Sequence, residues 1–125
     1  MKTATALILL PIEYNPDEKN QRRQVSIKAF QDTAIEITRI FEKYDLGCTI
    51  DPYPKHGVWV KLGILYEDVN TILEINNFPI TEKKQLIKYC EEKLLKRFEQ
   101  EAILIKFIPE VQAEVVTIKK GDNQG

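Results

Sequence analysis

The residues that could carry acid–base chemistry are few and lie far apart along the chain. His56 is the only histidine, Asp68 lies in the middle of the chain, and Glu101 stands where a helix is expected to run into a strand. An imidazole and two carboxylates can exchange protons with a substrate when they reach the same cleft. His56, Asp68 and Glu101 are therefore the candidate catalytic residues.

Three further side chains are candidates for binding a ligand. Trp59 and Tyr66 would supply apolar surface with a polar edge, and Gln100 would supply an amide. Each also has a structural interpretation. Trp59 is more readily explained as an anchor of a core or an interface. Gln100 and Glu101 could bind the backbone groups left unpaired at the helix end, and we favour this interpretation because a sharp helix-to-strand corner needs such partners.

Motifs for metals, cofactors and activated nucleophiles are absent from the sequence. A single histidine without a partner at ligand spacing does not predict a zinc site. The five glycines never form a phosphate-binding loop, and no GxSxG element is present. The two cysteines, Cys48 and Cys90, fall in different expected elements, so we expect reduced thiols. We expect no metal and no cofactor.

The composition is that of an ordinary globular domain. Hydrophobic residues make up 43% and charged residues 30%, and the net charge of -1 offers no attraction to nucleic acid or to anionic membranes. We expect one domain over residues 1–118 and a flexible tail over 119–125. The apolar run 4–10 is too short to span a bilayer and no cleavage site follows it, so we interpret it as a strand and expect a cytoplasmic protein without a membrane partner.

Two amphipathic helices are expected to position the candidate residues. Ser26 is expected to cap the first, which carries an apolar stripe and is ended by residues 45–47, with Gly47 as a C-terminal cap or turn residue. Thr81 is expected to cap the second, which ends near Phe98 or Gln100. The charged residues of both helices are expected to face solvent.

A meander of short antiparallel strands is expected between the helices, with an edge strand at the C-terminal end. The expected strands cover residues 5–10, 48–50, 58–62, 64–66, 71–75, 102–108 and 110–115. The stretch 13–24 is expected to be a polar surface loop, in which Arg22 and Arg23 are solvated.

The order strand, helix, strands, helix, strand predicts an α+β fold. This order is typical of the ferredoxin-like, split βαβ arrangement, in which two helices cover one face of an antiparallel sheet.

Two of the expected strands are apolar on both faces. In the later of them, Ile103, Ile105 and Phe107 would face one side, and Leu104 and Ile108 the other. An open second face would be a larger apolar patch than monomers usually expose. We therefore expect this face to pack on another copy of the chain, with a dimer as the first assignment, or on the C-terminal segment.

The spacing of several residues resembles a group of short bacterial and phage proteins of unknown activity. Their pattern contains Gly-x-Trp, then Gly-x-x-Tyr-x-Asp, then Phe-Gly-Gln-Glu-Ala. The matching stretches of this chain are Gly57–Trp59, Gly63–Asp68 and Phe98–Ala102. The chain departs from the group at Leu46, at Val60-Lys61 and at Glu99, where the group has glycine, Arg-Asp and glycine. The resemblance implies a small α+β fold and no particular activity.

Two function hypotheses follow from these observations. In the first, the chain is a non-enzymatic, homo-oligomeric binding or assembly protein with a small-ligand site at the subunit junction. In the second, it is a small cofactor-independent enzyme of the dimeric ferredoxin-like barrel type, which uses His56, Asp68 and Glu101 as acid–base groups around Trp59 and Tyr66. Nucleic-acid binding ranks third because the chain carries no excess of positive charge.

Overall fold

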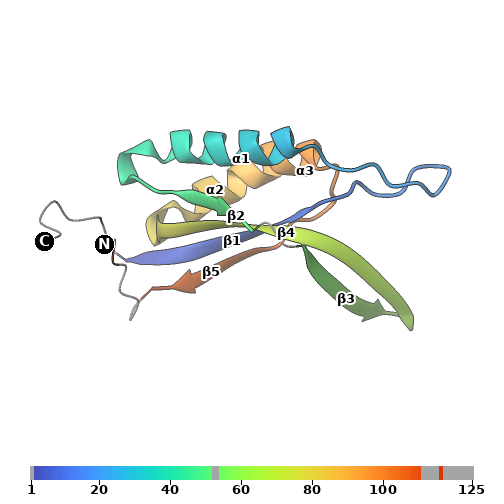
Figure 1. Cartoon of the computed structure of the whole chain (residues 1–125). Coiled ribbons are helices and arrows are strands. Elements are labelled where there is room, and N and C mark those ends of the chain that lie inside the picture. Colours follow the sequence, from blue (N-terminus) through green and yellow to red (C-terminus); the bar gives the residue numbers. More distant parts are fainter. Residues whose placement is uncertain (1, 52–53, 111–115, 117–125) are drawn as a thin grey trace, which may run out of the picture.

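The computed structural model describes residues 2–51, 54–110 and 116. In this part of the chain an antiparallel sheet of five strands carries two helical segments, an α+β fold (Figure 1). The strands are β1 (Thr3–Pro11), β2 (Cys48–Ile50), β3 (Lys55–Lys61), β4 (Ile64–Pro79) and β5 (Ile105–Pro109). The first helical segment is α1 (Ile27–Ile40) followed by the turn η1 (Glu42–Tyr44). The second runs through η2 (Ile80–Glu82), α2 (Lys83–Tyr89), η3 (Cys90–Leu94) and α3 (Leu95–Arg97).

The sheet has β1 at its centre, with the strand order β2-β4-β1-β5. β1 pairs with one half of β4, from Pro11 opposite Asn70 to Thr3 opposite Pro79. β3 pairs with the other half, from Lys61 opposite Ile64 to Lys55 opposite Asn70. Because Asn70 has both partners, β3 must lie on the edge of β4 that faces away from β1, the edge that β2 also occupies.

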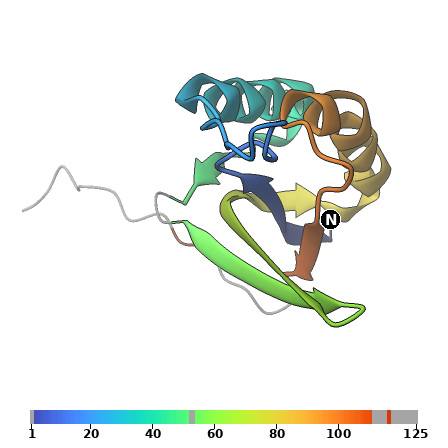
Figure 2. The ribbon, with the colours of Figure 1, turned by 90° about the vertical axis from the view of Figure 1, so that its right-hand side faces the viewer.

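Both helical segments cover the same face of the sheet (Figure 2). Along β1, alternate residues are buried under the helices and the residues between them are only partly covered. Three phenylalanines, Phe41, Phe78 and Phe98, are fully buried in this layer, and Phe41 meets Phe78 edge to face with ring centroids 5.2 Å apart. The core therefore lies on one side of the sheet.

The helix starts and ends follow the expected chemistry in part. Ser26 caps α1 as predicted, and its Oγ accepts a hydrogen bond from the Ala29 amide at 3.2 Å. The first helical segment ends within the expected stretch 45–47, but α1 itself ends at Ile40 and η1 follows it. The left-handed residue at the end is Asp45, at φ 55°, rather than Gly47. Thr81 lies in the turn η2 rather than at a side-chain cap of α2.

The second helical segment ends in a left-handed residue that is not glycine. Glu99 has φ 52°, its amide donates to the Lys96 carbonyl at 3.2 Å, and the Gln100 amide donates to the Leu95 carbonyl at 2.8 Å. These two bonds are those of a Schellman motif, which usually has glycine at the left-handed position.

A partly buried ion pair joins the two helical segments. Arg97 Nη2 donates to Glu36 Oε2 at 2.7 Å, and Arg97 Nη1 donates to the buried Thr33 hydroxyl at 3.0 Å. The Tyr89 hydroxyl donates to Glu36 Oε1 at 2.7 Å. Burial alone would raise the pKa of Glu36, but the hydrogen bonds from Arg97 and Tyr89 outweigh it and lower that pKa.

The middle of the chain differs from the expected meander of short strands. The expected strands 64–66 and 71–75 and the stretch 67–70 between them all belong to one strand, β4 (Ile64–Pro79), which is 16 residues long. Glu67, Asp68 and Asn70 suggested a connection because such residues are depleted in strands. They are tolerated here because this half of β4 extends beyond the core, where polar side chains reach solvent. The predicted turn 76–80 is also largely strand, with an irregularity in the β1 register and a left-handed Asn77 at φ 58°.

The sheet face opposite the helices carries apolar side chains, as expected. Leu104 and Ile108 are half-exposed there, while Ile103, Ile105 and Phe107 pack against the core. β5 begins at Ile105, three residues later than expected. The predicted edge strand continues into residues 111–115, which lie outside the described residues.

Glu110 holds three strands together at one end of the sheet. Its carboxylate accepts hydrogen bonds from the Thr3 hydroxyl at 2.8 Å, the Thr5 hydroxyl at 2.6 Å and the Asn77 amide at 3.2 Å. Burial opposes ionisation, but these three bonds outweigh it and lower the pKa of Glu110.

No helix in the described part of the chain is long and apolar enough to cross a membrane.

We predict that Glu110→Gln lowers the free energy of unfolding at neutral pH by about 1 kcal/mol, because an amide replaces a carboxylate that accepts three hydrogen bonds. The folded-state pKa lies below the ordinary value of 4.5, so the stabilisation is complete above that value and is lost as the pH falls through the folded-state pKa. Denaturant unfolding at about pH 7 and about pH 3 measures both limits. The deficit should shrink at the lower pH, and Glu18→Gln, at an exposed position, should show none. A deficit of equal size at both pH values would contradict the assignment.

We also predict that Glu99→Gly is more stable than Glu99→Ala by about 1 kcal/mol, because only glycine adopts the left-handed conformation without steric cost. Both variants lose the exposed ion pair between Glu99 and Arg23, so that loss cancels in the comparison. Thermal and denaturant unfolding of the two variants are the measurements. Equal stabilities, or a more stable alanine variant, would show that residue 99 is not held in this conformation.

Candidate functional site

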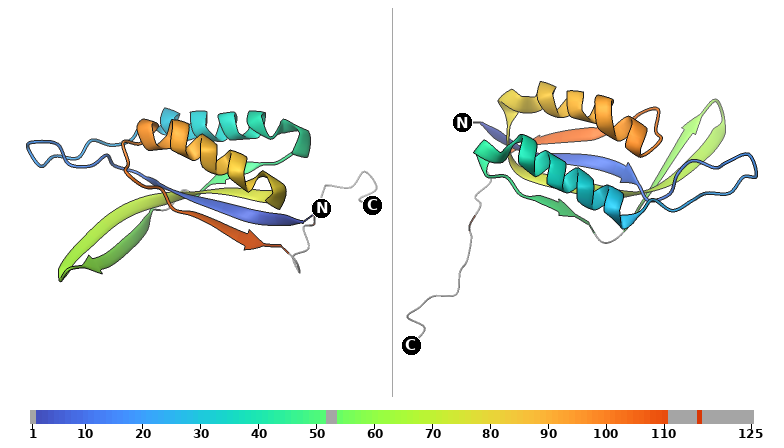
Figure 3. Two further views of the ribbon diagram at one scale, coloured as in Figure 1. Left: turned by 180° about the vertical axis from the view of Figure 1, so that it is seen from behind. Right: turned by 90° about the horizontal axis from the view of Figure 1, so that it is seen from above.

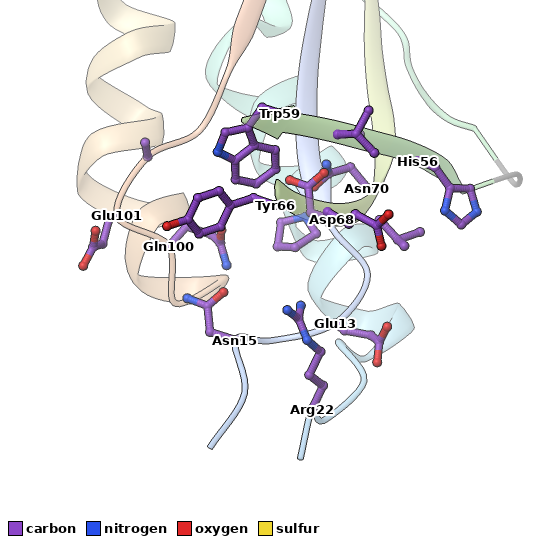
Figure 4. A pocket seen from close by; sticks show the side chains of 16 residues that line it. Glu13, Asn15, Arg22, His56, Trp59, Tyr66, Asp68, Asn70, Gln100 and Glu101 are labelled. Carbon is purple, nitrogen blue, oxygen red and sulfur yellow. The ribbon is translucent and has the colours of Figure 1, made fainter. Parts of the chain in front are cut away.

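A cavity of about 790 Å³ lies at the end of the sheet where β1 stops. Pro11 is the last residue of β1, whereas β4 continues for six residues beyond its pairing with β1. The loop after β1 and the segment that leads into β5 form the other walls. The lining residues are Pro11, Glu13, Asn15, Arg22, His56, Gly57, Val58, Trp59, Tyr66, Glu67, Asp68, Val69, Asn70, Gln100, Glu101 and Ala102 (Figure 4).

The wall on one side is the β3–β4 hairpin, residues 55–70, which we call the arm. It leaves the same end of the sheet as the loop after β1, and the helices do not cover it (Figure 3). Leu62 and Gly63 connect its strands, and both have positive φ, 52° and 77°. Two positive φ values are the property of the type I′ turn, which matches the twist of paired strands.

The register of the arm divides its side chains between two faces. Gly57 is opposite Asp68 and Trp59 is opposite Tyr66, so these four residues share one face, the inner face. His56 pairs with Val69, one residue out of phase with them, and therefore belongs to the outer face.

Trp59 and Tyr66 form the aromatic part of the cavity. Their rings stack with centroids 5.5 Å apart and an interplanar angle of 12°. Trp59 is 48% exposed and Tyr66 is 39% exposed. Trp59 is thus not a core residue in this chain, and the stacked pair presents apolar surface to the cavity and to solvent.

Asp68 is positioned by the glycine opposite it. A Cβ at Gly57 would lie 2.5 Å from Asp68 Oδ1, so a side chain there would displace the carboxylate. Among the residues that the structure describes, none forms a hydrogen bond or an ion pair with the Asp68 carboxylate. The group is therefore available to a ligand in the cavity.

Gln100 and Glu101 play different parts at the helix-to-strand corner. Gln100 Nε2 donates to the Phe98 carbonyl at 3.1 Å, which is the expected contact with an unpaired carbonyl of the helix end. Glu101 is exposed, and its carboxylate points away from the other labelled side chains in Figure 4. Gln100 lies closer to Tyr66 in the same view.

The three candidate catalytic residues line one cavity but do not share one face. His56 lies at the far end of β3 from Trp59 in Figure 4 and is exposed. Asp68 belongs to the inner face of the arm, and Glu101 is directed outward at the opposite wall. The four candidates that lie together are Trp59, Tyr66, Asp68 and Gln100.

The loop after β1 contributes site residues that the sequence analysis missed. Glu13, Asn15 and Arg22 line the cavity. The loop is tied back to the fold: a backbone bridge joins Glu13 to Gln24, and Arg23 pairs with Glu99 at 3.1 Å. The sequence of the loop shows only polar character, and no local pattern indicates that it folds beside residues 100–102.

The charges around the cavity are mainly negative. Glu13, Glu67, Asp68 and Glu101 provide carboxylates, and Arg22 provides a guanidinium. No group of three or more histidine, cysteine, aspartate or glutamate side chains in the described ranges is arranged to hold a metal ion.

A second, smaller hollow of about 280 Å³ adjoins the cavity. It shares Pro11, Asp68 and Gln100 with the cavity and extends to Leu9 and Leu104. The site thus continues onto the apolar face of the sheet.

Comparisons of the chain with protein-family models, with curated proteins and with solved structures found no match.

Proposed function

We propose that this chain is a non-enzymatic, homo-oligomeric binding protein that takes a small ligand in the cavity beside the arm. The observation that carries the proposal is the convergence of Trp59, Tyr66, Asp68 and Gln100 on one hollow. Ligand sites combine apolar and aromatic walls with a few polar groups that fix orientation, and this lining has both.

Two features of the lining argue for binding rather than for packing alone. The stacked Trp59–Tyr66 pair is half-exposed, although a stable monomer gains more by burying such rings. The Asp68 carboxylate faces the cavity, in space that the absence of a side chain at Gly57 leaves open, and no described residue forms a hydrogen bond or an ion pair with it. A ligand with an apolar face and a hydrogen-bond donor or a positive charge would satisfy both groups.

The charge balance narrows the ligand chemistry. Of the four lining carboxylates, Glu67 belongs to the outer face of the arm and Glu101 points outward, whereas Asp68 faces the cavity. The Asp68 charge would repel an anionic ligand and favour a cationic or neutral one. A cation can also interact with the exposed face of an aromatic ring.

The acid–base hypothesis for His56, Asp68 and Glu101 stays a prediction with less support. Acid–base catalysis needs the groups within direct or one-water reach of the same substrate atoms. His56 belongs to the outer face of the arm and Glu101 points outward, so Asp68 is the only one of the three whose strand position faces into the cavity.

We also propose that the domain is a ferredoxin-like fold with an added arm. The order β2-β4-β1-β5 with both helical segments on one face supports this assignment, because β1 and the second half of β4 form the centre. We retain the cytoplasmic location, the absence of membrane and nucleic-acid partners, and the resemblance to short bacterial and phage proteins as predictions.

Trp59 is the only tryptophan in the chain, so its fluorescence and its indole N–H signal report directly on the cavity. We predict that benzylamine and tetramethylammonium perturb these signals more strongly than benzoate does. Asp68→Asn should weaken binding of the two cations about tenfold or more, since it removes the facing charge. Glu91→Gln, at an exposed helix position, is the matched control and should bind as the unmodified chain does.

The proposal would be wrong if none of these probes, nor extracts of small metabolites, changed the Trp59 signals at millimolar concentration. A stronger response to benzoate than to benzylamine would contradict the charge argument alone.

A further inference from the structure

The outer face of the arm carries apolar side chains that nothing in the described structure covers. Val58 and Val60 are each 66% exposed and Leu65 is 60% exposed. All three belong to the outer face, because Val58 is opposite Glu67 and Val60 is opposite Leu65. Val58 also lines the cavity, but Val60, Leu62 and Leu65 lie outside it, so most of this apolar surface is separate from the ligand site.

The tip of the arm is more unusual. Leu62 is 92% exposed and has φ 52°. The first position of a type I′ turn favours asparagine, aspartate or glycine, and a leucine there is strained. A large apolar side chain at this position is costly for the isolated chain in two ways, since it strains the turn and exposes apolar surface. A contact made by Leu62 would offset both costs.

The arm has little support from the rest of its own chain. Among the described strands, β3 pairs only with β4, and residues 64–69 of β4 lie beyond the last pair with β1. An isolated two-stranded hairpin is marginally stable in water and gains stability when it packs on another surface.

A second copy of the chain fits the outer face in area and in charge. The exposed parts of Val58, Val60, Leu62 and Leu65 amount to on the order of 500 Å² of apolar surface per copy. This lies towards the upper end of the roughly 300–600 Å² of the largest apolar patch on a typical monomer, which is often functional, and it is more than half of the roughly 800 Å² that each partner loses in a standard interface.

The charges are distributed as a self-complementary interface requires. Lys55 and Lys61 belong to the inner face by register, so two outer faces can meet without bringing lysines together. His56 and Glu67 stand beside the apolar centre on the outer face and would form its polar rim. A two-fold arrangement would place the same patch on both copies.

We propose that the chain dimerises through the outer faces and tips of two arms, which leaves the inner face of each arm free to bind ligand. The inference rests on the homo-oligomeric state in the proposed function and assigns its interface to the arm rather than to the apolar face of the sheet.

Sedimentation of the full chain over a dilution series tests the interface with two arm variants and a control variant. Leu62→Asn replaces the strained leucine by the residue that the turn prefers, so it should leave the unfolding of the chain unchanged or make it more stable. Val60→Thr keeps a β-branched side chain. Each should raise the dimer dissociation constant at least about tenfold. The control Ile35→Thr removes a similarly exposed apolar side chain from α1 and should leave that constant unchanged.

A chain that stays monomeric at the highest concentration would overturn this inference. A dimer that resists both arm variants but dissociates with Leu104→Thr would also overturn it and would place the interface on the sheet face. The fluorescence response of Trp59 to benzylamine, measured on the same samples, distinguishes failure of the dimer interface from failure of the ligand proposal. A monomeric chain that still responds to benzylamine overturns the interface but retains the ligand site. The arm interface requires that the two arm variants weaken the dimer and keep the response to benzylamine.

Discussion

The difference in length between two paired strands determines the rest of this structure. β1 has 9 residues and ends at Pro11, whereas its partner β4 has 16 residues. One more backbone hydrogen bond joins the chain to β4, from the Ile12 amide to the Val69 carbonyl at 3.2 Å, and the chain then leaves the sheet. β4 goes on without β1 and is paired there only with β3, which lies on its other edge. The open edge of the arm and the space beside it both follow from this early stop.

The site is built from the segments that surround this space. The arm supplies Trp59, Tyr66 and Asp68, and the corner after α3 supplies Gln100. Gln100 is held by its bond to the Phe98 carbonyl, and the neighbouring Glu99 is linked to the loop after β1 through Arg23. The left-handed conformation at Glu99 therefore helps to set both the helix end and one wall of the cavity.

The proposed ligand site and the proposed dimer interface use different faces of the arm. The inner face carries the aromatic rings of Trp59 and Tyr66 and the Asp68 carboxylate, which accepts no hydrogen bond from the described residues. Such a combination of aromatic and polar groups is typical of a ligand site. The outer face carries aliphatic groups without lysine, which is the chemistry of an interface. The alternation of a β-strand makes this separation possible with one hairpin.

Local sequence signals predicted part of this arrangement. The Ser26 cap, the alternation of residues 103–108 and the polar role of Gln100 all depend on neighbours along the chain, and the structure agrees with them. The sequence analysis divided β4 because Glu67, Asp68 and Asn70 have low strand propensity and therefore indicated a connection. In the structure these polar residues are tolerated within the strand because they lie beyond the core. The contributions of Glu13, Asn15 and Arg22 were missed because they depend on contacts between distant segments, for which a single sequence gives no local sign.

The central claim is that the chain is a dimer with a ligand site on each arm, and native mass spectrometry of gently purified protein tests it most directly. The account predicts a species of twice the chain mass that carries additional small-molecule mass. Replacement of Trp59 by alanine should remove the additional mass and leave the dimer. A bare monomer at every concentration would contradict the account.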